Sequence, residues 1–276
     1  MSASEHQVWR EFVERRCGID FGETRIDYLC MRLWERMRLR EMTNYNYYYH
    51  YVAFNPQGEQ EWNELVELLV TKETSFFRHQ PSFKALQDYV LPQLISLRQS
   101  QGVNSLNIWS ACCATGEEPY SLAMVLLKSI EPDLIQLKVL GSDISKTALE
   151  YARIGRYKPT AIRSMPIDYQ KNYLFEVEDR QGSYYQVHDN VKAITQFSQF
   201  NFKQLDECWI KDQDVIFCQN VLIYFRPEYR IAAVEQLCQR LKPGGFLFLG
   251  PGEIVGLKLP GIEASHLENS SVYQRI

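Results

Sequence analysis

The stretch "SACCATGEEPYS", residues 110–121, poses the central question about this chain. It follows the apolar segment "LNIW" (106–109) and precedes a segment with helical periodicity. In an α/β protein, a loop that leads from a strand into a helix is the usual place for a nucleotide. This loop has only one glycine and carries two adjacent acids, Glu117 and Glu118, so the ligand it accepts is not obvious.

Outward from this loop, strand-like and helix-like segments alternate. The strand-like segments are "LNIWS", "LKVLGSD", "DVIFCQN" and "GGFLFLG", and helix-period segments such as "SKTALEYARIG" and "PEYRIAAVEQLCQRL" separate them. Such alternation predicts βαβ units and a mainly parallel sheet covered by helices. Residues 171–200 contain shorter alternating segments, which predict a small antiparallel β-subdomain.

The first third of the chain has a different pattern. Apolar side chains recur there at intervals of three and four residues, so residues 1–90 are predicted to form an all-α domain. A polar stretch with one glycine predicts a linker over 91–105. The predicted organisation is therefore a helical N-terminal domain followed by an α/β domain over 106–276.

Composition excludes several classes of protein. Apolar residues make up 45% and charged residues 23% of the chain, which is typical of a globular protein. The net charge of −4 argues against a general nucleic-acid binder. The sequence contains no secretory leader and no run long enough to span a bilayer, which predicts a cytoplasmic protein. Neither the seven cysteines nor the five histidines have metal-ligand spacing, so no metal is expected.

The residues of the 110–121 loop argue against a phosphate ligand. Dinucleotide-binding loops use several glycines to bring backbone amides close to a pyrophosphate, whereas Glu117 and Glu118 would repel one. A simpler interpretation is that Thr115 and Glu118 form a capping box for the following helix. Asp143, at the end of the next strand, is placed to bind ribose hydroxyls, although it is also a candidate N-cap. A cationic nucleoside without phosphate, such as S-adenosylmethionine, would suit both acidic features.

Five ordered blocks resemble the CheR-type chemotaxis protein methyltransferases. They are "RLWERMRLR", "TKETSFFRH", "WSACCATGEEPYSLA", "GSDIS" with "ALEYARIGRY", and "FCQNVLIYF" with "LKPGGFLFLG". The resemblance implies an all-α domain followed by a Rossmann-like S-adenosylmethionine-dependent methyltransferase domain with a small antiparallel β-subdomain. It also implies methylation of glutamate side chains on the cytoplasmic helices of chemoreceptors, with S-adenosylhomocysteine as the product.

The resemblance also assigns site residues. Arg78 and Tyr224 match positions proposed to act near the methyl group. The positions that match the cofactor site are Thr74, Arg78, Glu117, Asp143, Asn201, Phe202, Gln219 and Asn220. Two positions depart from the family pattern: Lys72 stands where asparagine is common, and Gln219 stands where arginine is usual. Glu117 is expected to face the cofactor, with Glu118 at the helix cap, whereas Phe76 and Phe77 either pack on adenosine or seat their motif.

These residue types suit methyl transfer from a sulfonium. A glutamate with a pKa of about 4.3 is already ionised at neutral pH, so no general base is required. Holding the carboxylate and the methyl group in line can contribute roughly 7–11 kcal/mol. Arg78 is able to orient a carboxylate through two parallel hydrogen bonds. Tyr224 would donate or accept a hydrogen bond at the reacting centre.

Recognition of the receptor is predicted to involve a basic helix. Arg25, Arg32 and Arg36 share one side of the segment 25–40, and such a ridge would attract glutamate-rich helices, although a solvated face is the ordinary meaning of this pattern. The segment "EDRQGSYYQV" lacks the G-x-G loop of peptide-dependent relatives, which favours recognition without a receptor tail peptide. A monomer is expected. The alternatives are a methyltransferase for a small molecule, a nucleic-acid base or another protein, and a non-catalytic S-adenosylmethionine sensor.

Overall fold

The computed structural model describes residues 1–131, 134–180, 182–254, 256–265, 267 and 269–276. The chain forms two compact units. The helical unit consists of Met1–Thr71 together with the short segment Tyr224–Arg226. The α/β unit consists of Lys72–Ile223 and Pro227–Ile276.

The helical unit is built from four α-helices and one 3₁₀ turn among its described residues. They are α1 (Ala3–Cys17), η1 (Glu23–Arg25), α2 (Ile26–Leu39), α3 (Tyr45–Phe54) and α4 (Gly58–Leu69). A capping box starts α1, in which the Ser2 hydroxyl accepts from the Glu5 amide and the Glu5 carboxylate accepts from the Ser2 amide. The apolar face of each helix meets a shared core that includes Trp9, Leu29 and Leu65.

The α/β unit contains a seven-stranded sheet in the order β6-β2-β1-β7-β8-β10-β9. Its strands are β1 (Ser105–Ala111), β2 (Gln136–Asp143), β6 (Thr195–Gln199), β7 (Gln213–Cys218), β8 (Leu241–Leu249), β9 (Ile262–Ser265) and β10 (Ser271–Arg275). The first five run parallel to one another, whereas β10 pairs antiparallel with both β8 and β9. The predicted α/β fold with a mainly parallel sheet is therefore confirmed.

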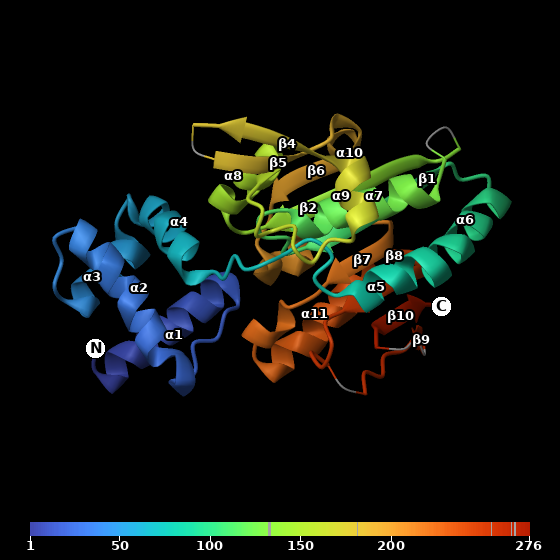
Figure 1. Cartoon of the computed structure of the whole chain (residues 1–276). Coiled ribbons are helices and arrows are strands. Elements are labelled where there is room, and N and C mark those ends of the chain that lie inside the picture. The colour runs from blue at the N-terminus through green and yellow to red at the C-terminus, as the bar shows by residue number, and fades with distance from the viewer. Residues whose placement is uncertain (132–133, 181, 255, 266, 268) are drawn as a thin grey trace. The chain divides into compact units, whose positions relative to one another are not determined.

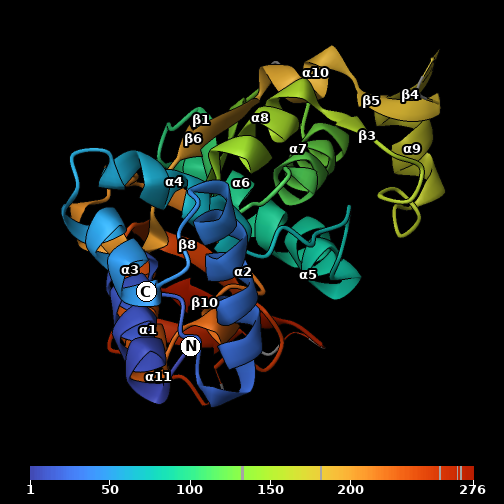
Figure 2. The ribbon, with the colours of Figure 1, turned by 90° about the vertical axis from the view of Figure 1, so that its left-hand side faces the viewer.

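Helices cover both faces of this sheet. The helices and helical turns are α5 (Gln80–Ala85), η2 (Leu86–Val90), α6 (Leu91–Ser100), α7 (Glu117–Ser129), α8 (Lys146–Ile154), α9 (Ile167–Tyr173), α10 (Asp189–Ala193), η3 (Phe202–Glu207), η4 (Leu222–Tyr224) and α11 (Pro227–Gln239). The crossovers through α7 and α11 run in opposite directions along the sheet, so the right-handed rule places these helices on opposite faces, as Figure 2 shows.

The core of the α/β unit lies between the sheet and these helices. Phe217 on β7 and Phe248 on β8 have no exposed surface, and their rings stack with centroids 4.3 Å apart. Burial on both faces explains why the central strands are continuously apolar rather than alternating.

The small antiparallel sheet has three strands in the order β3-β5-β4. The bounds are β3 (Arg156–Tyr157), β4 (Leu174–Asp179) and β5 (Gly182–Val187), and Figure 1 shows β4 and β5 as a hairpin. The hairpin lies within the predicted range 171–200, but "AITQFSQF" contributes β6, which joins the large sheet beside β2.

The boundary between the units lies at Thr71 and Lys72, whereas sequence periodicity placed it at residue 90, followed by a linker over 91–105. In the structure, α6 occupies most of that linker. Its residues Leu91 and Leu94 are buried in the core that also contains residues of α7. These helices belong to the α/β unit because their apolar faces are buried there.

Candidate active site

Five parallel strands bring their carboxyl ends to one edge of the large sheet. Because β6, β2, β1, β7 and β8 run in the same direction, the segments that follow them meet at this edge (Figure 1). These segments carry the acids after β1 and β2, Asn201 after β6, Asn220 after β7 and Glu253 after β8.

The loop after β1 has an unusual backbone. Cys112 and Ala114 adopt left-handed conformations, with φ of 58° and 47°, and such conformations cost non-glycine residues of order 1 kcal/mol or more. The amide of Cys113 donates to the Ser142 carbonyl (2.8 Å), which holds the loop against the end of β2. Gly116 has a φ of 94°, and a Cβ atom there would lie 2.6 Å from the Cβ of Ala152. The single glycine of the loop therefore permits its close approach to α8.

The two acids of this loop have separate partners. Glu117 is 4% exposed and accepts a hydrogen bond from the Thr115 hydroxyl (2.7 Å). Glu118 accepts one from the Ser110 hydroxyl on β1 (2.6 Å). The N-cap of α7 is Gly116, which provides no side-chain cap. The predicted Thr115–Glu118 capping box is therefore wrong, because each of the two side chains bonds to another residue.

Burial controls the ionisation of both acids. It raises the pKa of Glu117, although the hydrogen bond from Thr115 opposes the shift. Burial also raises the pKa of Glu118 to about 7, with Ser110 and the charge of Arg78 opposing and the charge of Glu253 adding to the rise. The edge of the sheet therefore holds carboxyl groups that a bound positive charge would stabilise in their ionised form.

Asp143 connects the ends of β1 and β2. It is 8% exposed; its Oδ2 accepts from the Ala114 amide (2.9 Å) and its Oδ1 accepts from the Ser145 amide (2.9 Å). Its two oxygens thus hold the loop after β1 and the turn before α8. The N-cap of α8 is Ser145, whose hydroxyl accepts from the Ala148 amide. Asp143 is thus not the helix cap.

The motif over residues 72–78 is anchored on the α/β unit. Phe76 and Phe77 are buried, with the Phe76 ring edge-on to Tyr157 and the Phe77 amide donating to Ser121 Oγ (3.0 Å). These contacts assign both phenylalanines to seating the motif. Arg78 is exposed and donates to the Glu73 carbonyl (3.0 Å). The Lys72 ammonium donates to Thr147 Oγ1 at the start of α8 (2.7 Å).

Two further loops complete the edge. After β6, Asn201 caps η3 by accepting from the Lys203 amide (3.1 Å), and Phe202 is buried behind it. After β7, the side-chain amide of Gln219 donates through Nε2 to Ser82 Oγ (2.8 Å) and to the Leu249 carbonyl (3.1 Å). Asn220 follows with a left-handed φ of 61°. Thr74 lies in the anchored 72–78 motif and is half-buried.

Sequence reasoning did not single out Glu253, a buried acid at the same edge. It is 3% exposed and accepts three backbone hydrogen bonds, from the amides of Val221, Leu222 and Gly250. Its position in the sequence could have indicated it, because Glu253 follows the apolar strand "GGFLFLG" by a few residues, and ligands of open α/β sheets bind beyond the carboxyl ends of the strands.

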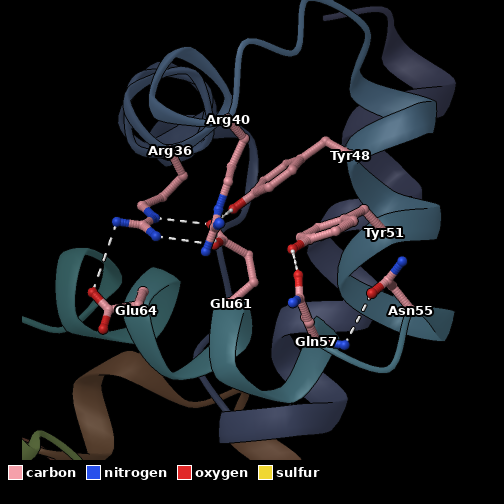
Figure 3. A network of polar contacts seen from close by, with 8 residues as sticks. All are labelled: Arg36, Arg40, Tyr48, Tyr51, Asn55, Gln57, Glu61 and Glu64. Atoms are coloured by element: carbon pink, nitrogen blue, oxygen red, sulfur yellow. Dashed lines mark hydrogen bonds and ion pairs between the residues drawn. The ribbon is translucent and has the colours of Figure 1, made fainter.

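In the helical unit, the three arginines of the predicted basic ridge make different kinds of contact. Arg36 binds Glu61 through two parallel hydrogen bonds of 2.9 Å, and Arg40 and Tyr48 bind the same carboxylate at 2.7 and 2.8 Å (Figure 3). Glu61 has no exposed surface. Burial alone would raise the pKa of Glu61, but its hydrogen bonds lower that pKa below the ordinary value. Arg36 thus neutralises a buried acid.

The other two arginines of the ridge contact aromatic rings. The Arg25 guanidinium lies over the rings of Phe21 (4.7 Å) and Tyr224 (5.3 Å). Arg32 lies over Tyr28 (4.9 Å) and bonds to Glu35 (3.2 Å). The backbone carbonyl of Tyr224 accepts from the Asp20 amide, which makes this tyrosine part of the helical unit.

Neither a metal site nor a membrane span is found in the described ranges. No three side chains of histidine, cysteine, aspartate or glutamate are grouped there as metal ligands would be. No helix in those ranges has the length and apolar character that crossing a membrane requires.

Comparison with known proteins gives matches along nearly the whole chain. The family model described as "CheR methyltransferase, all-alpha domain" matches residues 4–70, and the model "CheR methyltransferase, SAM binding domain" matches residues 72–266. Chemotaxis protein methyltransferase 2 of Vibrio cholerae is 32% identical, over 89% of this chain and 83% of its own length. Chemotaxis protein methyltransferase 2 of Pseudomonas aeruginosa is 31% identical, over 96% and 90%. A probable chemotaxis protein methyltransferase of Rhizobium etli is 33% identical, over 86% and 88%.

Proposed function

Since the chain belongs to the CheR methyltransferase family, we propose that it transfers a methyl group from S-adenosylmethionine to glutamate side chains on the cytoplasmic helices of chemoreceptors. The observation that carries this proposal is the set of carboxyl groups at the carboxyl edge of the sheet, Glu117, Glu118 and Asp143. They would repel a phosphate but suit a nucleoside that carries positive charge.

The residues at this edge fit the cofactor chemically. When bound, S-adenosylmethionine supplies a methyl group activated by the positive sulfonium. Asp143 offers a carboxylate at the end of β2, where an acid is placed to bind ribose hydroxyls, and Glu117 offers a carboxylate to a positively charged group. The other proposed contacts are Thr74, Arg78, Asn201, Phe202, Gln219 and Asn220. The side-chain amide of Gln219 already donates to Ser82 and Leu249, so we propose that its part in the site is to hold the loop.

Arg78 and Tyr224 are proposed to act on the substrate glutamate. Arg78 is exposed, and its Nη1 donates to the Glu73 carbonyl. A guanidinium has five N–H donors, so Arg78 is able to hold a carboxylate as well. Such a contact would hold one carboxylate oxygen and leave the other in line with the methyl group, as attack on that group requires. Tyr224 would hydrogen-bond at the reacting centre. No step requires removal of a proton, because the substrate is ionised at neutral pH.

We propose that Arg25, at the end of η1, and Arg32, on α2, contribute to receptor binding. Both are half-buried and pack on aromatic rings, which orders them without neutralising them fully. Arg36 donates two hydrogen bonds to Glu61, so we propose that it contributes to receptor binding only by long-range attraction. We further propose that the protein acts in the cytoplasm as a monomer, needs no metal, and does not depend on a receptor tail peptide.

The decisive experiment follows labelled methyl from S-adenosylmethionine into purified receptor fragments. Label should be transferred to the receptor fragments, and mild base should release it, as expected of an ester. The Arg78→Ala variant should not transfer label. Base-stable label would indicate another acceptor chemistry. Cofactor binding without transfer to any receptor would indicate a sensor. Submicromolar binding of a receptor tail peptide would refute peptide independence.

A further inference from the structure

Glu253 makes an unusual set of contacts for a buried carboxylate. It lies just beyond β8, and within the described part of the chain its carboxylate accepts from three backbone amides: Val221 (2.8 Å) and Leu222 (2.9 Å) donate to Oε1, and Gly250 (2.7 Å) donates to Oε2. Among the residues described, no basic side chain forms an ion pair with it. Its charge is therefore stabilised by amides of the neighbouring loop.

The backbone around Glu253 is shaped for this contact. A Cβ atom at Gly250 would lie 2.4 Å from Glu253 Oε2 and 3.0 Å from the amide nitrogen of Asn220. Only a residue without a side chain lets both groups approach so closely. Gly250 therefore allows the end of β8 to pack closely against the loop that follows β7.

That loop needs a partner to hold its conformation. Asn220 has a left-handed φ of 61°, a conformation that asparagine adopts more readily than most residues with a side chain but that is still less favourable than the right-handed region. Leu222 begins the short turn η4, and its amide and that of Val221 have no partners within the turn. Glu253 supplies the missing acceptor for both amides. The contact thus stabilises the loop just after Asn220.

We infer that Glu253 is a positioning residue, which holds Asn220 and its loop in the conformation that binds the cofactor. The inference rests on the proposed cofactor site at this edge of the sheet. The negative charge of Glu253 also adds to the rise in the pKa of Glu118, which places the two carboxylates within electrostatic range of each other. Removal of the charge would therefore change the loop and the field together, and the test has to separate these effects.

Asp214 provides a matched control within the same sheet. It has no exposed surface and accepts from the Asn107 amide (2.7 Å), but Arg98 (2.6 Å) and Lys242 (2.8 Å) neutralise it. It lies near the start of β7, at the opposite end of the strand from Asn220. Asp214→Asn should therefore disturb the fold without disturbing the proposed cofactor site.

The experiment measures the Kd of the full chain for S-adenosylmethionine and for S-adenosylhomocysteine by calorimetry. Glu253→Gln keeps the shape but turns an amide N–H toward that of Gly250, so both Kd values should rise equally, by about tenfold or more. Asp214→Asn should leave both unchanged. In the methylation assay, the KM for the cofactor should rise while the KM for the receptor stays constant. The amides of Val221 and Leu222 should exchange hydrogen faster in the Glu253 variant only, because the neutral oxygen of glutamine is a weaker acceptor than a carboxylate oxygen.

Three results would overturn the inference. Unchanged Kd values in a folded Glu253→Gln protein would show that the contact has no part in binding. A rise for the cationic cofactor alone would show that Glu253 acts as a direct charge rather than by positioning. Equal losses in Asp214→Asn would show general damage to the fold. If Glu253→Gln does not fold, Glu253→Asp, which keeps the charge but shortens the reach, should give a smaller, equal rise. Wild-type protein that binds neither ligand would refute the proposed function as well.

Discussion

Replacing Glu118 by glutamine should leave the stability of the protein nearly unchanged at pH 5 and should raise it at pH 7 and above. Burial is the main reason that the pKa of this acid rises from 4.5 to about 7. At 1.36 kcal/mol per pKa unit, this difference corresponds to about 3 kcal/mol. The folded state thus binds a proton more tightly than the unfolded state, so stability falls as pH rises from about 4.5 to about 7. Solvent reaches part of this side chain, so about 3 kcal/mol is an upper limit.

The assay is urea unfolding of wild type and Glu118→Gln at a series of pH values from 5 to 8. Glutamine has the same shape and is able to accept the Ser110 hydrogen bond, so the two proteins should be about equally stable at pH 5. At pH 8 the variant should be more stable by about 1–3 kcal/mol, because it avoids ionisation of a buried group.

Glu61→Gln in the helical unit is the control of opposite sign. The folded-state pKa of Glu61 is lowered, so its ionised form contributes stability above the unfolded pKa, and that contribution is lost as pH falls through the folded pKa. This variant should therefore be less stable than wild type at pH 8. Stability profiles of wild type and Glu118→Gln that run parallel from pH 5 to pH 8 would refute the reasoning.

The remaining predictions concern the arginines of the basic ridge and the acids of the proposed cofactor site. Arg32→Ala should slow receptor methylation at low ionic strength, with the difference fading as salt rises, whereas Arg36→Ala should lower the free energy of unfolding by about 3 kcal/mol because it deprives a buried carboxylate of two hydrogen bonds. Glu117→Gln should raise the Kd for S-adenosylmethionine more than Glu118→Gln does; equal effects in calorimetry would end that distinction. Asp143→Asn should raise the Kd for S-adenosylmethionine and the Kd for S-adenosylhomocysteine by a similar factor of about ten, because both ligands carry the ribose. An unchanged Kd for either ligand would count against ribose binding by Asp143.

Much of the fold could be predicted from local patterns. The strands "LKVLGSD" and "DVIFCQN" are apolar runs of strand length, and each ends in a polar residue that the parallel arrangement brings to the ligand edge. Placing Asp143 at this edge therefore needed only the strand assignment and the rule for open sheets.

Local patterns could not predict the boundary between the two units. Residues 80–100 have the same helical periodicity as residues 3–69, and periodicity shows that an apolar face is buried without showing what buries it. In the structure Phe83, Leu86 and Leu94 are buried in the core that contains α7. Membership of a unit was decided by those long-range contacts.

The sequence by itself determined the order of the four strands β1, β2, β7 and β8, the acidic character of the loop after β1, and the family to which its motifs point. Tertiary structure alone decided which partners the charged groups take. Thr115 bonds to Glu117 rather than Glu118, Arg36 bonds to Glu61 twenty-five residues away, and Glu253 holds a loop more than thirty residues before it. The physical reason is that periodicity and propensity act between near neighbours, whereas a buried charge is stabilised by whichever donors the folded chain brings within hydrogen-bonding distance.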